Sequence, residues 1–483
     1  MSIMFNNLKD RFKNIFRNHN YIDDDYDITS HDNNFSIGSN TTTEDDIRNL
    51  EQARDTSRLY SKNNGFVKGL LRASRDNVIG TGLKAKSNLS RKHFKNLTES
   101  QLKNIEDNIN NYFNKWALSK NSDITQNNNF YLQQRLAYFT YKRDGDVFAT
   151  LPLLRNEINL RLIPPEFVSY DSADGFIQGI RTNQYGRPVE YAINKSEDSL
   201  DDFIILRNSI NKQNVLHLFD NERINSLRGM PFTTEIIRDC VYIDDYMKSE
   251  LQASQIASKF IGTIKTQSKG NIFETKKTNL LKNNLGNTEA NLKKQERTFK
   301  HNTITQLKPD EELDIINKGR DNPNFDKIVN TSLQKVSSCT RIPIEIILTV
   351  FTSSYSASRA SMLLLEKFIK PERELFNTKF NNPIRNQVIE WGVLKGDLNI
   401  PDFFNNKDEY LNCEWLGDAQ GSVDPVKDAK AKVTLIDNNL TTREKATRDL
   451  GNGDFEANAK QLEKEKEILK QNNLIFDEVQ NDN

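Results

Sequence analysis

The chain has 483 residues, of which 36% are hydrophobic, and it carries 67 Lys and Arg against 67 Asp and Glu. This length allows two to four structural units, and the composition is too apolar for a wholly disordered chain. A net charge of zero provides no overall basic excess of the kind that grips a DNA backbone. If the chain contacts a nucleic acid, either it does not hold it tightly or its charges are sorted by face.

The three cysteines, Cys240, Cys339 and Cys413, lie far apart in the sequence. No pair has the spacing of metal ligands, and an odd count argues against a disulfide framework. A reducing, cytosolic compartment is the simplest interpretation. We expect no membrane span, because no apolar run approaches the ~20 residues that cross a bilayer, and no signal peptide, because the first residues lack its apolar core.

The N-terminal residues form an amphipathic pattern. Apolar side chains recur at helical spacing among Lys and Arg at Phe5, Leu8, Phe12, Ile15 and Phe16. A helix of this kind docks on a membrane or on another protein, and we expect the protein surface. The polar residues that follow, to residue 46, have the composition of a flexible linker.

Helical patterns come next, over residues 44–79, 98–118 and 130–142. Gly80-Thr-Gly82 is expected to end the first helix. Thr98 and Gln101 form a possible capping box for the second, and Asp144-Gly145 closes the third.

The apolar period changes to that of strands between residues 146 and 220. Strand patterns cover residues 146–151, 160–163, 167–170 and 215–219. Residues 176–181 and 189–193 flank the turn-forming segment 183–188, which predicts a hairpin. We therefore expect a small, mostly β unit between helical regions.

The longest helical pattern follows Pro231 and continues for about 28 residues, on the order of 42 Å. A second helix follows Pro323 and stops before Arg341. The intervening residues 262–312 are rich in Lys and Asn, with a strand-like segment at 303–307. Two long helices separated by an insertion predict a hairpin with a tip domain.

A serine-rich segment at residues 352–358 precedes a long helix that we expect from about Ser358 to Phe380. Asn382-Pro383 should break this helix, and a further helix should reach Gly396. The tail after Asp424-Pro425 is helical and highly charged. The fold class expected is α+β, mainly α.

No residue pattern indicates a catalytic centre. Gly80-Thr-Gly82 lacks the preceding strand that a dinucleotide or phosphate loop needs, so a helix stop is favoured. His217 lies in an apolar strand and is expected to be a satisfied core residue rather than a ligand. Asp244-Asp245 on a long helix is expected to be a solvated or interface pair rather than a cation site. The serines lack a nucleophile elbow and predict a polar loop; they are Ser353, Ser354, Ser356 and Ser358.

A succession of short blocks resembles the portal proteins of lambda-like tailed phages. The blocks are Arg58–Asn64, Asn77–Gly82, Gly145–Phe148, Gly179–Arg181 with Gly186–Tyr191, His217–Phe219 with Arg223, Arg228–Pro231, Glu250–Ala253, Tyr355–Arg359, Trp391 with Gly396, and Trp415–Gly417 through Val423–Ala429. The resemblance rests on their order and spacing. It marks as structural motif residues Arg228, Gly229, Tyr355, Arg359, Asp424, Pro425 and Lys427. In two respects the chain departs from the family: Ser226 stands where members usually carry Gln, and the N-terminal 45 residues are longer and more polar.

The resemblance implies a ring of copies of the chain, generally twelve, around a channel for double-stranded DNA at one capsid vertex. It also implies named parts: a flexible segment 1–46, a wing 47–230, stem helices 231–261 and 323–341, a clip 262–312, a tunnel loop with wing helices 342–422, and a crown 423–483. The implied partners are the large terminase subunit that drives packaging, head-completion or adaptor proteins, and major capsid and scaffold proteins. The location is the virion, with the host cytoplasm during assembly. No cofactor, no metal and no enzyme activity are expected.

Two sets of residues are candidates for contact with DNA, without sequence specificity. The first is the tunnel loop, where short hydroxyl side chains offer weak contacts to the backbone: Thr352, Ser353, Ser354, Tyr355 and Ser356. The second is a set of stem lysines, for each of which plain solvation is the alternative: Lys248, Lys259, Lys327 and Lys335.

Three other interpretations stay open. The same fold serves equally in a gene-transfer particle or a domesticated prophage. A structural tail or baseplate protein is a second rival. The third is a DNA-modifying or phosphoryl-transfer enzyme bound to the packaging machinery, against which stands the lack of any carboxylate, His or Cys cluster in the sequence.

Overall fold

The computed structural model describes residues 43–168, 175–194, 203–207, 215–221, 223–224, 226–259, 263–266, 311–314, 322–351, 354–419, 421, 424–451 and 453–472. Internal contacts divide the chain into residues 1–52 and residues 53–483. Of the first unit, residues 43–52 are described, and they are helical. The amphipathic pattern at residues 5–16 and most of the polar linker lie outside the described residues.

Two helices replace the single helix expected over residues 44–79: α3 (Thr43–Asn63) and α4 (Gly65–Val78). Asn64 separates them because its backbone is extended, with φ −111° and ψ 125°, and its side chain accepts a hydrogen bond from the Val67 amide. This contact caps α4. The side-chain amide of Asn64 also donates to the Cys240 carbonyl, so a tertiary contact helps fix the break.

The next two helices begin and end close to the predicted residues. They are α5 (Glu99–Leu118), followed by the short 3-10 turn η2 (Lys120–Ser122), and α6 (Phe130–Asp144). Thr98 and Gln101 form the expected capping box at the start of α5. Gly145 ends α6 in the left-handed conformation, with φ 87°, which costs glycine little.

The expected β unit follows α6. Its elements are β2 (Asp146–Thr150), β3 (Leu153–Leu154), β4 (Glu157–Ile158), β5 (Arg161–Ile163), the 3-10 turn η3 (Pro165–Phe167), β6 (Ile180–Thr182), β7 (Pro188–Asn194), β8 (Phe203–Arg207) and β9 (Leu216–Phe219). Two antiparallel sheets have the orders β5-β2-β9 and β6-β7-β8, and β3 pairs with β4. The predicted hairpin is confirmed, since Ile180 pairs with Tyr191 across the turn. Its first strand was expected over residues 176–181 but begins only at Ile180, because Gln178 and Gly179 adopt positive φ angles in a turn.

One expected strand is wrong in its described part. Residues 167–168 form the end of η3 and an isolated bridge at Val168 instead of a strand. Pro164 and Pro165 fix the backbone φ angle near −65° and favour the start of a turn. Far from this unit in sequence, β1 (Lys84–Ser87) pairs antiparallel with β12 (Cys413–Leu416).

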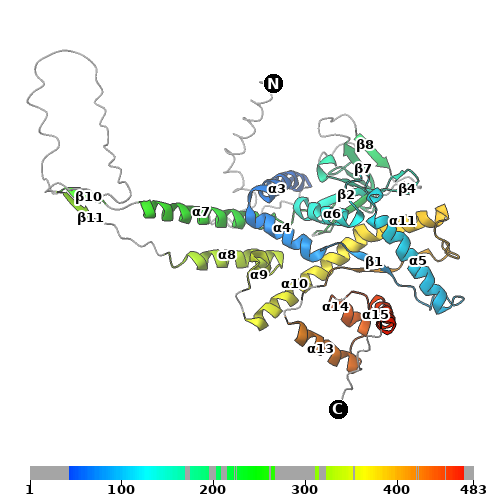
Figure 1. Cartoon of the computed structure of the whole chain (residues 1–483). Helices are drawn as coiled ribbons and strands as arrows, with labels where there is room; N and C mark the ends of the chain where they lie inside the picture. Colours follow the sequence, from blue (N-terminus) through cyan, green and yellow to red (C-terminus); the bar gives the residue numbers. More distant parts are fainter. Residues whose placement is uncertain are drawn as a thin grey trace, which may run out of the picture. The chain divides into compact units, whose positions relative to one another are not determined.

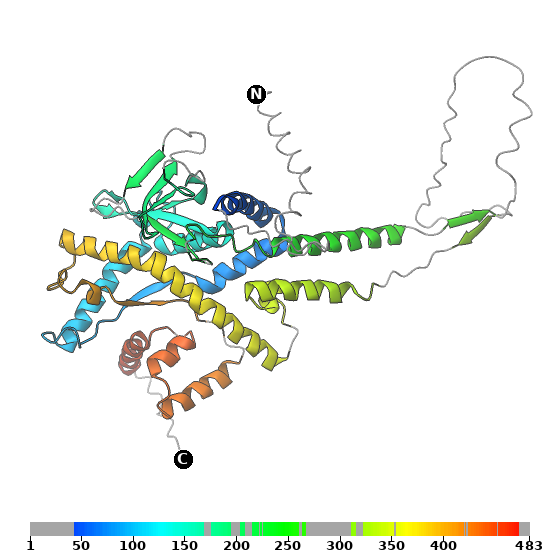
Figure 2. The ribbon, with the colours of Figure 1, turned by 180° about the vertical axis from the view of Figure 1, so that it is seen from behind.

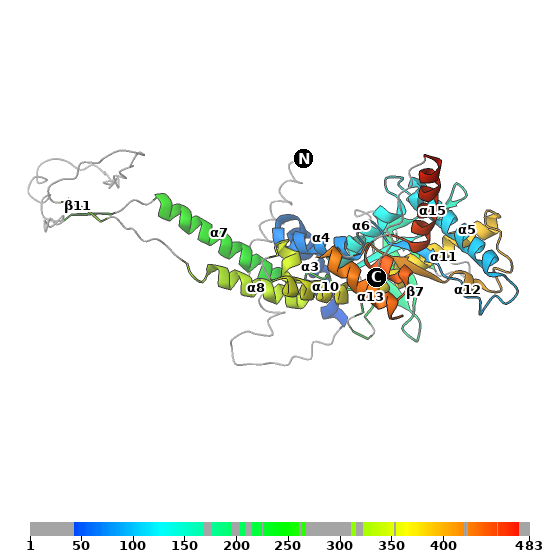
Figure 3. The same cartoon turned by 60° about the horizontal axis from the view of Figure 1, so that its bottom comes forward.

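The predicted helical hairpin is present (Figures 1, 2 and 3). Helices α7 (Ile237–Lys259) and α8 (Phe325–Thr340) lie side by side, and β10 (Thr263–Thr266) pairs antiparallel with β11 (Glu311–Asp314) between them in the chain. Helix α7 begins later than expected because the Phe232 amide donates to the Lys142 carbonyl of α6 and residues 232–236 form turns. The strand-like segment 303–307 lies outside the described residues.

The helical segment after the hairpin runs past the proline that was expected to break it. After the short α9 (Ile344–Leu348), α10 (Tyr355–Phe376) continues through the π-helix η4 (Asn377–Asn381) into α11 (Asn382–Lys395). In a regular α-helix the ring of Pro383 would clash with the carbonyl one turn earlier. The wider π-helical turn, in which the Asn382 amide bonds to the Asn377 carbonyl, accommodates the proline without ending the helix.

The C-terminal region is helical, as predicted. Its helices are α12 (Lys407–Tyr410), α13 (Pro425–Asp437), α14 (Arg443–Asp449) and α15 (Phe455–Gln471). Pro425 occupies the first turn of α13 behind the capping residue Asp424, a favoured position for proline.

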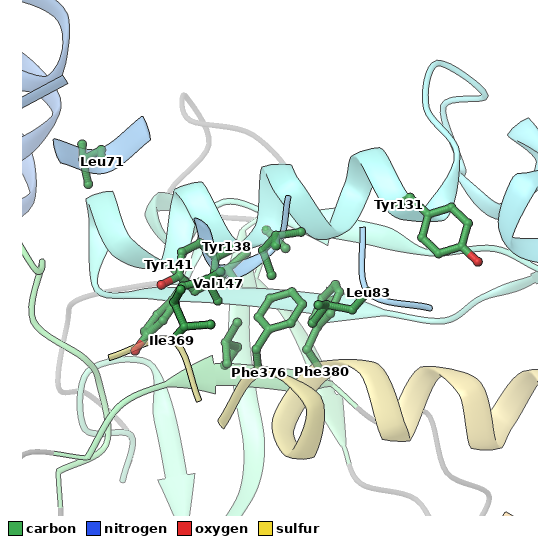
Figure 4. Close-up of a cluster of buried hydrophobic side chains, with 14 of the residues drawn as sticks. Leu71, Leu83, Tyr131, Tyr138, Tyr141, Val147, Ile369, Phe376 and Phe380 are labelled. Atoms are coloured by element: carbon green, nitrogen blue, oxygen red, sulfur yellow. The ribbon is translucent and has the colours of Figure 1, made fainter. Parts of the chain in front are cut away.

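The main apolar core lies where α4, α6, β2, α10 and η4 meet, and Figure 4 shows part of it. Tyr138 of α6 packs edge to face on Phe376 of α10, with ring centroids 5.8 Å apart, and Phe376 lies 4.9 Å from Phe380. Two smaller clusters join α5 to α11 and fill the β unit. Among the helices that the structure describes, none has the length and apolar content of a bilayer-crossing segment.

Candidate functional site

The centre of the β unit gathers several of the sequence blocks that carried the family resemblance. Asp146 begins β2, His217 lies on the neighbouring strand β9, and Arg228 lies in the segment that leads to α7. A fourth member, Arg54 of α3, is fully buried beside them. We call these four residues the Asp146 network.

The carboxylate of Asp146 is the hub of this network. Its Oδ2 lies 2.9 Å from a guanidinium nitrogen of Arg54 and 2.5 Å from Nε of Arg228. Nε2 of His217 lies 3.4 Å from the same oxygen. The same two guanidinium groups also donate to backbone carbonyls. Arg54 donates to Asp144 (2.7 Å) and Gly229 (3.3 Å), and Arg228 donates to Gln178 (3.0 Å) and Pro165 (3.3 Å). The network therefore ties α3, α6, the sheets and the entry to α7 together.

The protonation states follow from this geometry. Burial acts to raise the pKa of the Asp146 carboxyl, but the guanidinium groups of Arg228 and Arg54 outweigh burial and hold that pKa well below its usual range. Burial lowers the pKa of His217 to about 4, against the opposing effect of Asp146. The imidazole is stacked between Phe148 and Phe219, with ring centroids 4.2 and 4.3 Å away. His217 is thus a core residue, although its Nδ1 has no hydrogen-bond partner among the described residues.

Gly145 and Gly229 form a backbone contact next to this network. A Cβ on Gly145 would lie 2.2 Å from the Gly229 carbonyl oxygen, and a Cβ on Gly229 would lie 2.1 Å from the Gly145 carbonyl oxygen. Only glycine allows this approach. The Arg228-Gly229 motif therefore builds a junction between the end of α6 and the entry to α7, with the buried charges of the Asp146 network beside it.

A second constellation brings together motif residues from two distant blocks. Nη1 of Arg359 donates to the Tyr355 hydroxyl at 3.3 Å and to Oδ1 of Asp428 at 3.0 Å. The ammonium group of Lys427 lies 5.0 Å from the centroid of the Tyr355 ring, within the range of a cation–π contact. We call Tyr355, Arg359, Asp424, Lys427 and Asp428 the Tyr355 clamp.

Asp424 supports the clamp from the start of α13. Its Oδ1 accepts the backbone amide of Lys427 at 3.1 Å, and its Oδ2 lies 3.1 Å from the Lys427 ammonium group. The amide hydrogen bond from Lys427 lowers the pKa of the Asp424 carboxyl. The sequence placed these residues in one family signature, but only the fold shows that they touch.

The expected tunnel-loop residues divide between a loop and a helix. Thr352 and Ser353 lie outside the described residues, and Ser354 precedes α10. Tyr355 and Ser356 belong to the first turn of α10, and Ser358 is buried there. A polar loop over residues 352–358 is therefore wrong from Tyr355 onward. The residues before it, Val350 and Phe351, are half exposed (52% and 51%).

The candidate stem lysines have different surroundings. Lys248 lies 2.6 Å from Asp244 and 3.7 Å from Asp245, so the acidic pair contacts a cation of its own helix. Lys335 of α8 lies 2.9 Å from Asp239 of α7, which joins the two helices. Lys327 is exposed, and the side chain of Lys259 lies outside the description.

The remaining chemical candidates have structural partners. Oδ2 and Oδ1 of Asp418 accept the Thr81 amide (2.7 Å) and hydroxyl (2.8 Å), which fills the Gly80–Gly82 turn with a carboxylate. Gly80 and Gly82 have positive φ angles of 58° and 123°, as a helix stop requires. Within the described ranges, no group of three or more His, Cys, Asp or Glu residues is placed to hold a metal ion.

Sequence analysis did not single out some of the buried charges. Arg54 precedes the quoted Arg58 block by one helical turn, and no apolar periodicity marks it, because Ser57 and Ser61, which the fold buries on the same face, are polar. Lys142 lies 2.7 Å from Glu372 and 4.7 Å from the ring centroids of Tyr141 and Phe232. From the sequence alone, a buried lysine such as Lys142 cannot be distinguished from a solvent-exposed one, because its partner Glu372 lies on the distant helix α10.

Comparisons with known proteins give one family. The model of the family described as phage portal protein, lambda family, matches residues 31–373. A probable portal protein of Halomonas phage phiHAP-1 is 24% identical over 228 residues, which cover 44% of this chain and 42% of that protein. The chain thus matches less than half the length of this curated relative.

The chain is also similar to solved structures from gene transfer agent particles. The neck of a native particle, computed with C12 symmetry, is 9% identical, with a TM-score of 0.43, and the match covers 82% of this chain and 93% of that one. The virion of a native particle is 8% identical, with a TM-score of 0.44, and the match covers 84% and 93%.

Proposed function

Since the chain belongs to the lambda family of phage portal proteins, we propose that its copies form a ring around a DNA channel at one vertex of the capsid. In this role the ring admits the genome during packaging, joins the head to the tail and releases the DNA at ejection. The observation that carries the proposal is the family match over residues 31–373.

The surface of the helical hairpin supports a ring. Large apolar side chains are exposed on both helices in the single chain: Tyr242, Met247 and Leu251 on α7 and Ile328 on α8. Exposed apolar side chains gathered on one element are typical of an interaction surface. In a closed ring each hairpin has a neighbour on both sides, and head-to-tail contacts cover different faces of the same chain.

The parts of the proposed ring follow the elements. Residues 47–230 form the wing, in which the Asp146 network fixes the β unit to the helices. The α7–α8 hairpin forms the stem, with residues 231–261 and 323–341, and the insertion 262–312 forms the clip that meets the terminase and head-completion proteins. Residues 342–422 contain the tunnel loop and further wing helices, and residues 423–483 form the crown.

The charge distribution suits a channel through which DNA slides. Dense unpaired Lys and Arg would hold the phosphates, whereas Lys248 and Lys335 are each paired with an aspartate. Lys327 and Lys259 are the further candidates for passing contacts with the DNA backbone. At the tunnel loop, Thr352 to Ser354 with Val350 and Phe351 offer small hydroxyl and apolar contacts. The family is a structural one, so in this proposal the packaging motor is a partner protein.

End-on electron micrographs and native mass spectrometry of the purified chain test the ring. Twelve chains of 55.8 kDa give 12 × 55.8 ≈ 670 kDa, and we expect a closed ring with a central hole near that mass. A monomer as the sole species over a wide concentration range would overturn the proposal.

A further inference from the structure

The three C-terminal helices have almost no apolar core of their own. In α13, α14 and α15, all of whose residues are described, Ala446 is the one apolar side chain that is buried. Val426, Val433 and Leu462 remain 64%, 55% and 57% exposed. Because helices of this length are marginal in water without packing partners, another kind of contact must hold them against the chain.

Ion pairs supply that contact. They join α13, α14, α15 and the residues beside these helices to four other elements, which are β1, α5, β12 and α10. The pairs are Lys86–Glu444 (2.9 Å), Lys86–Asp454 (2.7 Å), Lys103–Glu456 (2.7 Å), Arg448–Glu414 (2.6 Å) and Arg359–Asp428 (3.0 Å). The side chains in these pairs are between 23% and 54% exposed, so dissolved ions reach them. Within the group, Lys432 of α13 pairs with Asp449 of α14, and α14 packs on α15.

One of these ion pairs belongs to the Tyr355 clamp. Arg359 binds Asp428 of α13 and the hydroxyl of Tyr355, while Lys427 of α13 covers the Tyr355 ring. Tyr355 is the first residue of α10, directly after the loop that follows Thr349. The position of α13 and the first turn of α10 are therefore held by the same few contacts.

We propose that α13, α14 and α15 form a salt-sensitive latch whose docking, through the Tyr355 clamp, sets the position of the first turn of α10. Exposed ion pairs are individually weak, and between 0.1 M and 1 M salt the Debye length falls from about 10 Å to about 3 Å, close to the N–O distances of these pairs. High salt therefore weakens the docking of the helices and loosens the first turn of α10 with them. The coupling is a property of the folded chain, and its relevance to a DNA channel rests on the proposed function.

Hydrogen exchange of the full-length protein, followed by mass spectrometry at about 0.1 M and about 1 M NaCl, tests the latch. We expect peptides from α13 to α15 and from residues 349–358 to exchange faster together at high salt, by about two- to fivefold for each exposed pair lost. Exchange that NaCl leaves unchanged, or slows, would show apolar docking and overturn the latch, because excluded salts strengthen apolar contacts.

Two variants separate docking from coupling. Lys86→Met removes two ion pairs that include no clamp residue, and we expect faster exchange both in α14–α15 and in residues 349–358. Arg359→Met opens the clamp itself, and we expect faster exchange in residues 349–358 and α13 while the Lys86 pairs still hold α14. Lys370→Met is the matched control, because it removes an exposed pair with Glu366 within α10 and should change neither region.

The coupling is refuted if Lys86→Met loosens α14 and α15 but leaves residues 349–358 at the wild-type exchange rate. Lys86→Arg should restore both rates, which a purely steric role of Lys86 would not predict. Native mass spectrometry of the same samples reports the ring separately. A latch that behaves as expected in a chain that forms no ring would refute the proposed function and leave the latch standing.

Discussion

Nε of Arg228 lies 2.5 Å from Oδ2 of Asp146, and both side chains are shielded from solvent. Arg54 contacts the same oxygen at 2.9 Å, so one carboxylate is shared by two guanidinium groups. Water cannot replace a lost partner at such a site without opening the fold. The network that the family motif marks is therefore a point where stability depends on charge balance.

Asp146→Asn tests this dependence. The substitution keeps the shape of the side chain but removes the negative charge that both buried guanidinium groups contact, and we expect the free energy of unfolding to fall by about 3–5 kcal/mol. Denaturant unfolding at pH 7 measures the loss. Asp76→Asn is the control, since the Asp76 carboxylate pairs with Arg75 and Arg135 at a half-exposed site and should cost at most about 1 kcal/mol. Equal losses in the two variants would contradict the role of burial.

His217 predicts how stability depends on pH. Its pKa is lowered to about 4 in the fold from about 6.5 in an unfolded chain. Between these values the unfolded state binds a proton that the folded state does not, so the His217 contribution to stability falls as the pH falls from about 6.5 to 4, by about 3 kcal/mol in total. The stabilisation that Asp146 contributes is fully present in this window, because its folded pKa is lowered and the window lies above the pKa of about 3.9 that the carboxyl has in an unfolded chain.

The comparison of wild type with His217→Phe isolates this contribution. Phenylalanine keeps the stacking between Phe148 and Phe219 and cannot take up a proton. The difference in unfolding free energy between the two proteins, measured at several pH values, should shift against the wild type as the pH falls through the window. His93→Gln removes an exposed histidine and serves as the comparison variant. A difference that is constant with pH would show that the fold does not keep His217 neutral.

Gly145 and Gly186 have similar φ angles, but we expect the two positions to tolerate alanine very differently. Gly145 has φ +87°, and a Cβ there would meet the Gly229 backbone at 2.2 Å, whereas Gly186, with φ +76°, has open space around it. Gly186→Ala should cost only the strain of the left-handed conformation, about 1–2 kcal/mol. Gly145→Ala should cost more than about 4 kcal/mol or prevent folding. Thermal unfolding of both variants measures the difference. Similar melting temperatures would contradict the close contact between the Gly145 and Gly229 backbones.

Local signals in the sequence located many of the helix ends. The capping box of Thr98 and Gln101, and the glycine stop at Gly145, are formed by residues a few positions apart, so the sequence contains the whole cause. Asn64 and Pro383 were misjudged because their effect depends on partners elsewhere. A contact with the Cys240 carbonyl helps fix the helix break at Asn64. A π-helical turn accommodates Pro383 without ending the helix.

For the same reason, local sequence patterns could not predict the side-chain contacts in the candidate sites. Asp146 meets Arg54 and Arg228 from 92 and 82 residues away, and Arg359 meets Asp428 across 69 residues. Family resemblance identified most of these residues as a set without saying what they contact. Spacing along the chain carries no information on such pairs, because the intervening elements bring them together.

The exposed apolar residues of the hairpin predict where ring assembly is vulnerable. Leu251 of α7 is 60% exposed in the single chain, so Leu251→Asp should leave the fold of the chain unchanged but place a charge in a covered contact, which is costly to desolvate. We expect native mass spectrometry to show the ring replaced by smaller species, with unchanged circular dichroism. Tyr185→Asp, in the turn between β6 and β7, is the control at an 83% exposed position. If Leu251→Asp still forms rings of full mass, the hairpin surface around Leu251 is not part of the ring interface.

The loop before α10 gives the last prediction, which separates assembly from DNA handling. Deleting residues 352–358 would also remove the first turn of α10 and the buried Ser358, so substitution of the exposed loop residues is the sharper change. Val350→Ser with Phe351→Ser should leave the ring mass unaltered, because both side chains are half exposed, and should reduce nuclease-protected DNA per particle severalfold if the loop contacts the packaged genome. Leu118→Ser, at the exposed end of α5, should leave both unchanged. Loss of the ring in the loop variant would show that this segment serves assembly instead of the channel.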